Sequence, residues 1–187
     1  KSTSDTALSD VISKNTAYNN KVNERISAFD GLKSLSTRLI NALQTTDATP
    51  ETIEDAKGFN RKMQGKKAST NQIPTDPSAP APNTISTSQQ SYDQLIQHLA
   101  GLVSVLEAEP SYTPNETDLQ VATLQNKISD LTSKNTAVAT AYTNISNSRI
   151  ARNKTLYTDS TSLVETANEV KKYIKSVYGA TSPEYAQ

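Results

Sequence analysis

Apolar side chains recur every three or four residues over long stretches of the chain, which is the spacing of one face of an α-helix. The two longest stripes each include one asparagine. One stripe consists of Val121, Leu124, Ile128, Leu131, Asn135, Val138, Tyr142 and Ile145, and the other of Leu8, Val11, Asn15, Tyr18, Val22, Ile26 and Phe29. Stripes of this kind favour long helices that pack lengthwise against one another.

Both asparagines lie in the same pentapeptide, Ser-Lys-Asn-Thr-Ala, which occurs at residues 13–17 and again at 133–137. A buried asparagine in an apolar seam fixes the register of helices at some cost in stability. We therefore predict that Asn15 and Asn135 set register, by bonding each other or by bonding a helix of a neighbouring chain. The alternative is that both are exposed where the stripe drifts to the surface.

The same spacing predicts five helices, and their ends carry sequence signals. They cover residues 4–47, 49–65, 88–109, 113–157 (or 113–153) and 161–178. Gly31 predicts a kink or a short break in the first helix, because glycine costs about 1 kcal/mol in a helix relative to alanine. In the last helix, Gly179 is the expected stop, and an apolar stripe is expected to face inward: Leu163, Ala167, Val170, Ile174 and Val177.

Two Thr-Pro pairs predict helix starts. Thr49 and Pro50 fit the N-cap and first-turn positions, and Gly65 fits the end of that helix. The segment 113–116, Thr-Pro-Asn-Glu, adds a capping-box glutamate and is the strongest local signal in the chain. The sequence thus predicts that the fourth helix begins at Thr113.

Residues 68–87 contain four prolines, at 74, 77, 80 and 82. Proline excludes a helix here and favours an extended linker. The predicted fold is therefore all-α: a single domain over residues 1–187, built as an elongated bundle of four to five long helices, in which residues 68–87 join two helical hairpins.

The charges balance, with 19 basic and 19 acidic residues, but they are segregated along the chain. No lysine or arginine occurs between Ala68 and Asn126, which is typical of an ordinary solvated surface; the alternative is electrostatic complementarity between neighbouring copies. The tyrosines near the C-terminus are also candidate interface residues, because tyrosine is enriched at protein–protein interfaces. The candidate interface residues are Arg61, Lys62, Lys66, Lys67, Glu107, Glu109, Lys171, Lys172, Tyr173, Lys175, Tyr178 and Tyr185.

The residues that support catalysis or metal binding are scarce. The chain has no cysteine and one histidine, His98, which lies beside a leucine stripe and is expected at a helix surface or boundary. A typical zinc site or a helical carboxylate–histidine site needs more ligands than this. Phosphate-loop, nucleophile-elbow and dinucleotide motifs are absent as well. We expect no enzyme activity, no catalytic or metal-binding residues and no cofactor.

Partners are restricted by the same features. A net charge of zero and a basic segment without interleaved aromatics argue against nucleic acid as a partner. Without a run of 18 apolar residues, membrane insertion is not expected. The polar N-terminal segment favours a cytoplasmic location, and export stays open.

Several segments resemble a family of small all-helical proteins from Bacteroidetes with no assigned function. The most distinctive is residues 170–183, Val-Lys-Lys-Tyr-Ile-Lys-Ser-Val-Tyr-Gly-Ala-Thr-Ser-Pro, and the others are 35–43, 55–57, 60–66, 112–119, 148–153 and 156–157. The resemblance implies a bacterial origin and a helical fold, and it implies no catalytic residues.

Together these patterns predict a non-enzymatic structural protein that self-assembles through helix faces into homo-oligomers, a filament or a lattice. The alternative is an adaptor or cargo-binding module that recognises a different protein through the same kind of face. Heptad positions alone do not separate the two.

Overall fold

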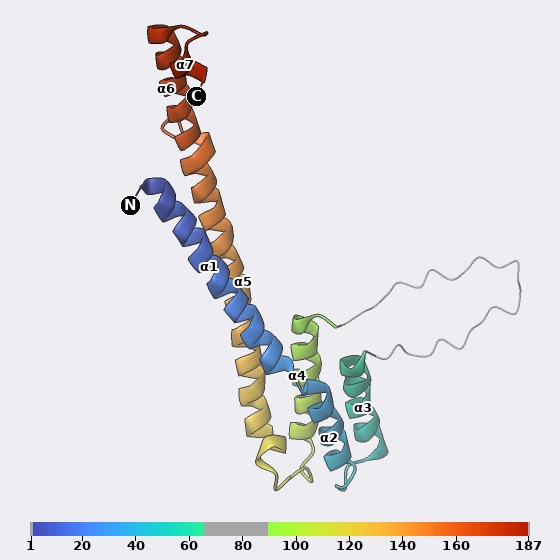
Figure 1. Cartoon of the computed structure of the whole chain (residues 1–187). Coiled ribbons are helices and arrows are strands. Elements are labelled where there is room, and N and C mark those ends of the chain that lie inside the picture. Colours follow the sequence, from blue (N-terminus) through green and yellow to red (C-terminus); the bar gives the residue numbers. More distant parts are fainter. Residues whose placement is uncertain (1, 66–89, 187) are drawn as a thin grey trace, which may run out of the picture. The chain divides into compact units, whose positions relative to one another are not determined.

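The computed structural model describes residues 2–65 and 90–186, and the regular elements in these ranges are all helical (Figure 1). They are α1 (Thr3–Phe29), α2 (Leu32–Leu43), α3 (Pro50–Gln64), α4 (Tyr92–Ala108), the 3-10 turn η1 (Thr117–Leu119), α5 (Val121–Asn153), the π-helical turn η2 (Lys154–Thr158), α6 (Leu163–Tyr178) and α7 (Pro183–Ala186). The all-α helical bundle is thus confirmed. The proline-rich linker predicted at 68–87 lies outside the described residues.

The chain divides into two compact units, and the boundaries between them fall within α1 and α5. Unit 1 consists of residues 1–24 and 136–187, and unit 2 of residues 25–135. The single domain expected from the sequence stays a prediction.

Unit 2 contains the main hydrophobic core, in which α3 packs against both α2 and α4. The most deeply buried side chains come from four helices and include Leu39, Met63, Leu102 and Leu131, each 0% exposed. Gly101 allows α3 and α4 to approach closely, because a Cβ atom there would lie 2.3 Å from the Phe59 ring. The unit therefore buries a continuous apolar interior.

The helix ends around Gly31, Thr49 and Gly65 follow the sequence signals. Gly31 adopts a left-handed conformation with φ of 73° and separates α1 from α2, which confirms the predicted break. The Thr49 side chain accepts a hydrogen bond from the Thr52 amide at 3.3 Å, and Gly65 ends α3 at φ of 74°. Local chemistry sets these helix ends: glycine adopts positive φ without strain, and a threonine side chain caps a free backbone amide.

The helix start predicted at Thr113 is wrong. Residues 113–116 lie in a loop, and α5 begins only at Val121. The reason is tertiary: Tyr112 and Leu119 are both buried, and the Tyr112 hydroxyl donates to the Leu119 carbonyl at 3.0 Å. Burial, together with the nearby charges of Glu116 and Asp118, raises the pKa of Tyr112 to about 12, so the hydroxyl stays protonated and donates.

Unit 1 contains far less core. In its described part the buried apolar side chains are Val138, Ile145 and Leu156. The rings of Tyr18 and Tyr142 lie 6.0 Å apart, but the Tyr142 side chain is 58% exposed. Within this unit the helices are therefore held by a thin apolar seam.

The seam predicted along α1 is partly wrong. Leu8, Asn15 and Ile26 are exposed, whereas Val11, Tyr18 and Phe29 are half-buried. The packed face of α1 still consists of residues spaced three and four apart, but this face is rotated around the helix relative to the predicted face. Asn15 thus lies on the surface of α1 and does not occupy a buried seam position.

Candidate association surface

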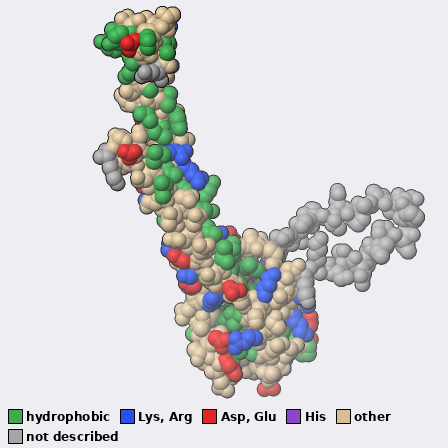
Figure 2. Space-filling view, viewed as in Figure 1, with side chains coloured by type: hydrophobic (Ala, Val, Ile, Leu, Met, Phe, Trp, Pro, Cys, Tyr) green, Lys and Arg blue, Asp and Glu red, His purple; other side chains and the backbone are tan. Residues whose placement is uncertain are grey.

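The large apolar side chains that remain exposed are concentrated in unit 1. Among the described residues, twelve large hydrophobic side chains are strongly exposed, and eleven of them belong to unit 1, Ile26 being the exception. They are Leu8, Ile12, Tyr142, Ile150, Tyr157, Leu163, Val164, Val170, Tyr173, Val177 and Tyr178. Figure 2 shows apolar side chains at the surface along the helices of this unit. Single exposed apolar side chains are normal on a soluble protein, but a concentration of them in one part of the molecule is typical of a binding surface.

Helix α6 is the centre of this surface. Its N-cap is Ser162, whose hydroxyl accepts a hydrogen bond from the Glu165 backbone amide at 3.2 Å, and the helix itself contains no buried residue. The stripe that was expected to face inward is exposed instead: Val170 is 52% exposed, Val177 53% and Leu163 56%. The prediction of the helix is thus confirmed and that of its buried face is wrong, because the described elements that pack most against α6, η2 and α7, leave most of the stripe exposed.

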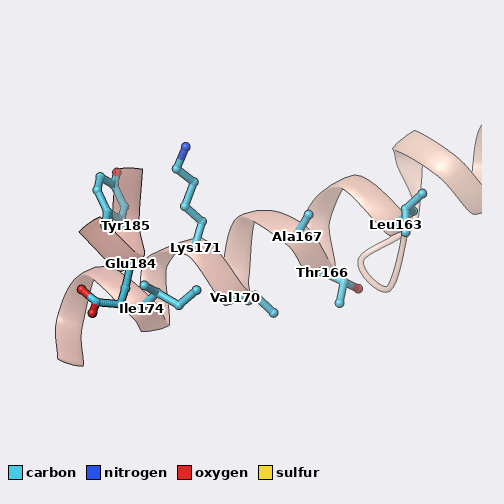
Figure 3. Close-up of a pocket in the computed structure, with 8 residues that line it drawn as sticks. All are labelled: Leu163, Thr166, Ala167, Val170, Lys171, Ile174, Glu184 and Tyr185. Atoms are coloured by element: carbon cyan, nitrogen blue, oxygen red, sulfur yellow. The ribbon is translucent and has the colours of Figure 1, made fainter. Parts of the chain in front are cut away.

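An apolar groove runs along α6 and is closed on one side by α7 (Figure 3). Its volume is about 380 Å³, and its lining is mostly apolar, with Leu163, Val170 and Ile174 among its residues. From α7, Tyr185 lies against the helix, with its ring centre 5.3 Å from Lys171 Nζ and 5.7 Å from Lys175 Nζ. Ile174 is the one stripe residue that is half-buried. The groove therefore offers an apolar floor bordered by the charged side chains of Lys171 and Glu184.

The structure brings together part of the predicted interface. Lys171, Lys175 and Tyr185 are neighbours, and Tyr173 and Tyr178 are 70% and 59% exposed on the same helix. Lys172, also exposed, lies on α6 as well. All of these residues belong to α6 or α7, but they lie on different sides of α6, and the neighbours among them are Lys171, Lys175 and Tyr185.

The other predicted interface residues lie in unit 2 and have local partners there. Arg61 pairs with Glu54 at 3.5 Å, and Lys62 Nζ lies 5.5 Å from the centre of the Phe59 ring. Glu107 accepts a hydrogen bond from the side-chain amide nitrogen of Gln125 at 3.1 Å. Lys66 and Lys67 lie outside the described residues.

Glu109, the remaining acid of the predicted set, is also held locally. It accepts hydrogen bonds from the Ser111 hydroxyl and amide, at 2.6 and 3.1 Å. These bonds lower the pKa of the Glu109 carboxyl, which stabilises its charged form within the turn after α4. Like its neighbours in unit 2, this acid has a structural partner within the chain.

Asn135 takes part in a polar cluster that the sequence pattern did not reveal. Its amide oxygen accepts a hydrogen bond from Arg25 at 3.0 Å, and its amide nitrogen donates to Asp93 at 2.7 Å. The Arg25 guanidinium in turn lies 4.0 Å above the Tyr92 ring, as a cation–π contact. The parts of α1, α4 and α5 that belong to unit 2 thus meet at one half-buried asparagine, whose partners are Arg25 and Asp93 rather than the predicted Asn15 or a neighbouring chain; its register-setting role stays a prediction.

The cluster around Asn135 joins residues far apart in sequence, so no local sequence motif predicts it. Arg25 and Asn135 are 110 positions apart, and Asn135 and Asp93 are 42 apart. The sequence contains only a weak signal for the exposed apolar residues Ile150 and Tyr157, because Ile150 lies off the main stripe of α5 and Tyr157 lies in η2, after that helix ends.

Other candidate chemistry is limited in the described ranges. His98 is buried in α4, at 7% exposure, and its Nε2 atom has no hydrogen-bond partner among the described residues. Burial, and to a smaller extent the charge of Lys62, lowers the pKa of this imidazole. Across residues 2–65 and 90–186 no group of three or more acidic, histidine or cysteine side chains is arranged to hold a metal ion. None of the described helices combines the length and the hydropathy that crossing a membrane requires.

Comparison with known proteins gave no relative: no family model matches the chain, and the searches of curated proteins and of solved structures found no match. The resemblance to a Bacteroidetes family therefore stays a prediction. The functional argument rests on the surface of unit 1 alone.

Proposed function

We propose that this is a non-enzymatic structural protein that self-associates, and that unit 1 is its association module. The observation that carries the proposal is the unequal distribution of apolar side chains. Unit 2 buries its large apolar residues, whereas unit 1 exposes eleven of the twelve that are strongly exposed in the described chain. Contacts with a partner would supply the core that unit 1 lacks.

The energetics support this proposal. Each large aliphatic side chain contributes roughly 1.5–3 kcal/mol when it is fully buried. Unit 1 buries only Val138, Ile145 and Leu156 in its described part, so its own packing stabilises it weakly. Small folding units with little core usually gain stability from disulfides, metals or oligomerisation, and this chain has no cysteine.

The composition of the surface also supports a protein partner. Aromatic residues are enriched at protein–protein interfaces, and unit 1 exposes Tyr142, Tyr157, Tyr173 and Tyr178. Tyrosine suits such a surface because its ring buries a large area while its hydroxyl keeps a hydrogen bond.

Light scattering coupled to size-exclusion chromatography tests the proposal, with the variant Val170→Glu and the control Ile26→Glu. Both residues are 52% exposed, but Val170 lies in unit 1 and Ile26 in unit 2. We expect the wild-type protein and Ile26→Glu to run above the monomer mass of 20.2 kDa, and Val170→Glu to shift toward that mass. Glutamate favours a helix at least as well as valine does, so α6 itself should persist.

A wild-type protein that stays at 20.2 kDa at every concentration would overturn self-association. The exposed surface of unit 1 would then be assigned to a different protein, as in the adaptor alternative. If both variants reduced the mass equally, the special role of unit 1 would be wrong.

A further inference from the structure

We propose that α6 pairs side by side and in parallel with the α6 of a second copy of this chain. The inference rests on the proposed self-association and goes further, because it names the helix, the partner segment and the relative direction of the two helices. Three observations on α6 carry it: its apolar stripe, the charges on either side of the stripe and the placement of two tyrosines.

The stripe of α6 has the spacing of a coiled-coil seam. Its members follow one another at intervals of four, three, four and three residues over the whole helix: Leu163, Ala167, Val170, Ile174 and Val177. Such a seam packs against an identical seam when two helices lie lengthwise. Four of the five members are exposed, and the fifth, Ile174, is half-buried. This seam of unit 1 is therefore accessible to a second copy of the chain.

The charges on either side of the stripe have opposite signs. At 100° per residue, Lys171 and Lys175 lie roughly 80–120° from the middle of the stripe on one side, and Glu169 lies roughly 120° from it on the other side, while Glu165 lies nearly opposite the stripe. When two copies pair in parallel around a two-fold axis, the basic flank of each helix faces the acidic flank of its partner. An antiparallel pair would instead bring like flanks together, so the charges favour the parallel arrangement.

Two exposed tyrosines fit the same geometry. Tyr173 lies on the acidic flank and Tyr178 on the basic flank, five residues later. In a parallel coiled coil, flanking residues five positions apart approach each other across the seam, as the charged pairs at these positions do. Tyr173 of one copy would therefore meet Tyr178 of the other, and both side chains, now 70% and 59% exposed, would be covered.

Disulfide trapping tests the direction, because the chain has no native cysteine. The variants are Leu163→Cys and Val177→Cys, near opposite ends of α6, with Ile26→Cys as the control in unit 2. Under mild oxidation, a parallel pair predicts that each α6 variant forms a disulfide-linked dimer with itself, several-fold faster than the control.

Each other result decides against some part of the proposal. If the two α6 variants cross-link only when mixed with each other, the helices pair antiparallel. If no cross-link forms while light scattering still shows a mass above the monomer, self-association holds but α6 is not its seam. A monomeric wild-type protein would overturn both this inference and the proposed function.

Charge reversal provides a second test that separates loss of pairing from loss of folding. Lys171→Glu with Lys175→Glu makes both flanks acidic, and Glu169→Lys makes both basic. We expect each variant alone to associate at least tenfold more weakly than the wild type, and an equimolar mixture of the two to recover association. Failure of the mixture to recover would contradict the role of the flanks.

Discussion

At the level of single residues, the close approach of α3 and α4 depends on Gly101. A Cβ atom at this position would lie 2.3–2.9 Å from three atoms of the Phe59 ring, so the ring would have to move. In α3, by contrast, a Cβ on Gly58 would meet nothing closer than 3.9 Å. Both glycines lie inside helices, so they form a matched pair.

We predict opposite effects for the two alanine substitutions. Gly101→Ala should lower the free energy of unfolding by about 1–3 kcal/mol, because overpacking outweighs the gain in helix propensity. Gly58→Ala should raise it by about 0.5–1 kcal/mol through propensity alone. Urea denaturation measures both, and stabilisation by Gly101→Ala would contradict the packing described.

His98 predicts a pH dependence of stability. Burial lowers the pKa of its imidazole below the ordinary value of 6.5, and Lys62 adds to the shift. Because the unfolded chain takes up the proton first, stability is full above pH 6.5 and falls as the pH drops toward the folded-state pKa. We expect the melting temperature to decline between pH 7.5 and 5.5, and His98→Leu to flatten that decline. If the melting temperature of His98→Leu declined with pH as steeply as that of the wild type, other titratable groups would be the cause of the decline.

At the level of elements, α1, α4 and α5 are joined in unit 2 by Asn135. Replacing it by leucine removes the acceptor of Arg25 and leaves a half-buried guanidinium without that bond. We predict that Asn135→Leu lowers the free energy of unfolding by about 2–4 kcal/mol. Adding Arg25→Met should recover part of the loss, because it removes the unpaired charge, and urea denaturation of the single and double variants measures this. Equal stability of Asn135→Leu and the wild type would contradict the cluster's role.

The elements also show how far sequence reasoning reaches. Thr49, Pro50 and Gly65 predicted the ends of α3 correctly, since capping depends on adjacent residues. Thr113 and Pro114 carry a stronger signal of the same kind but lie in a loop, because burial of Tyr112 and Leu119 outweighs a local cap. Local signals succeed where no distant contact competes.

The candidate surface was predictable only in part, and for a related reason. Apolar spacing predicted a helix at 161–178, close to the observed α6 at 163–178, and composition singled out Lys171, Lys175 and Tyr185. A stripe does not reveal, however, whether its partner lies in the same chain or in another one. The distant contacts of Asn135 and the exposure of α6 required the structure.

At the level of the whole molecule, the chain combines one well-packed unit with one that exposes its apolar side chains. Unit 2 can fold around its own core, as its buried leucines indicate. Helix α6 of unit 1 has 16 residues and no buried side chain, and helices of this length are marginal in water without tertiary support. The central claim is therefore that a second copy supplies the support that α6 lacks.

Hydrogen exchange of the backbone amides at low and at high protein concentration measures this support most directly. The account predicts that amides of α6 exchange at least tenfold more slowly at the concentration where the protein is associated, while those of the unit 2 core do not change. If α6 exchanged at the same rate at both concentrations, although the mass had increased, its role in association would be contradicted.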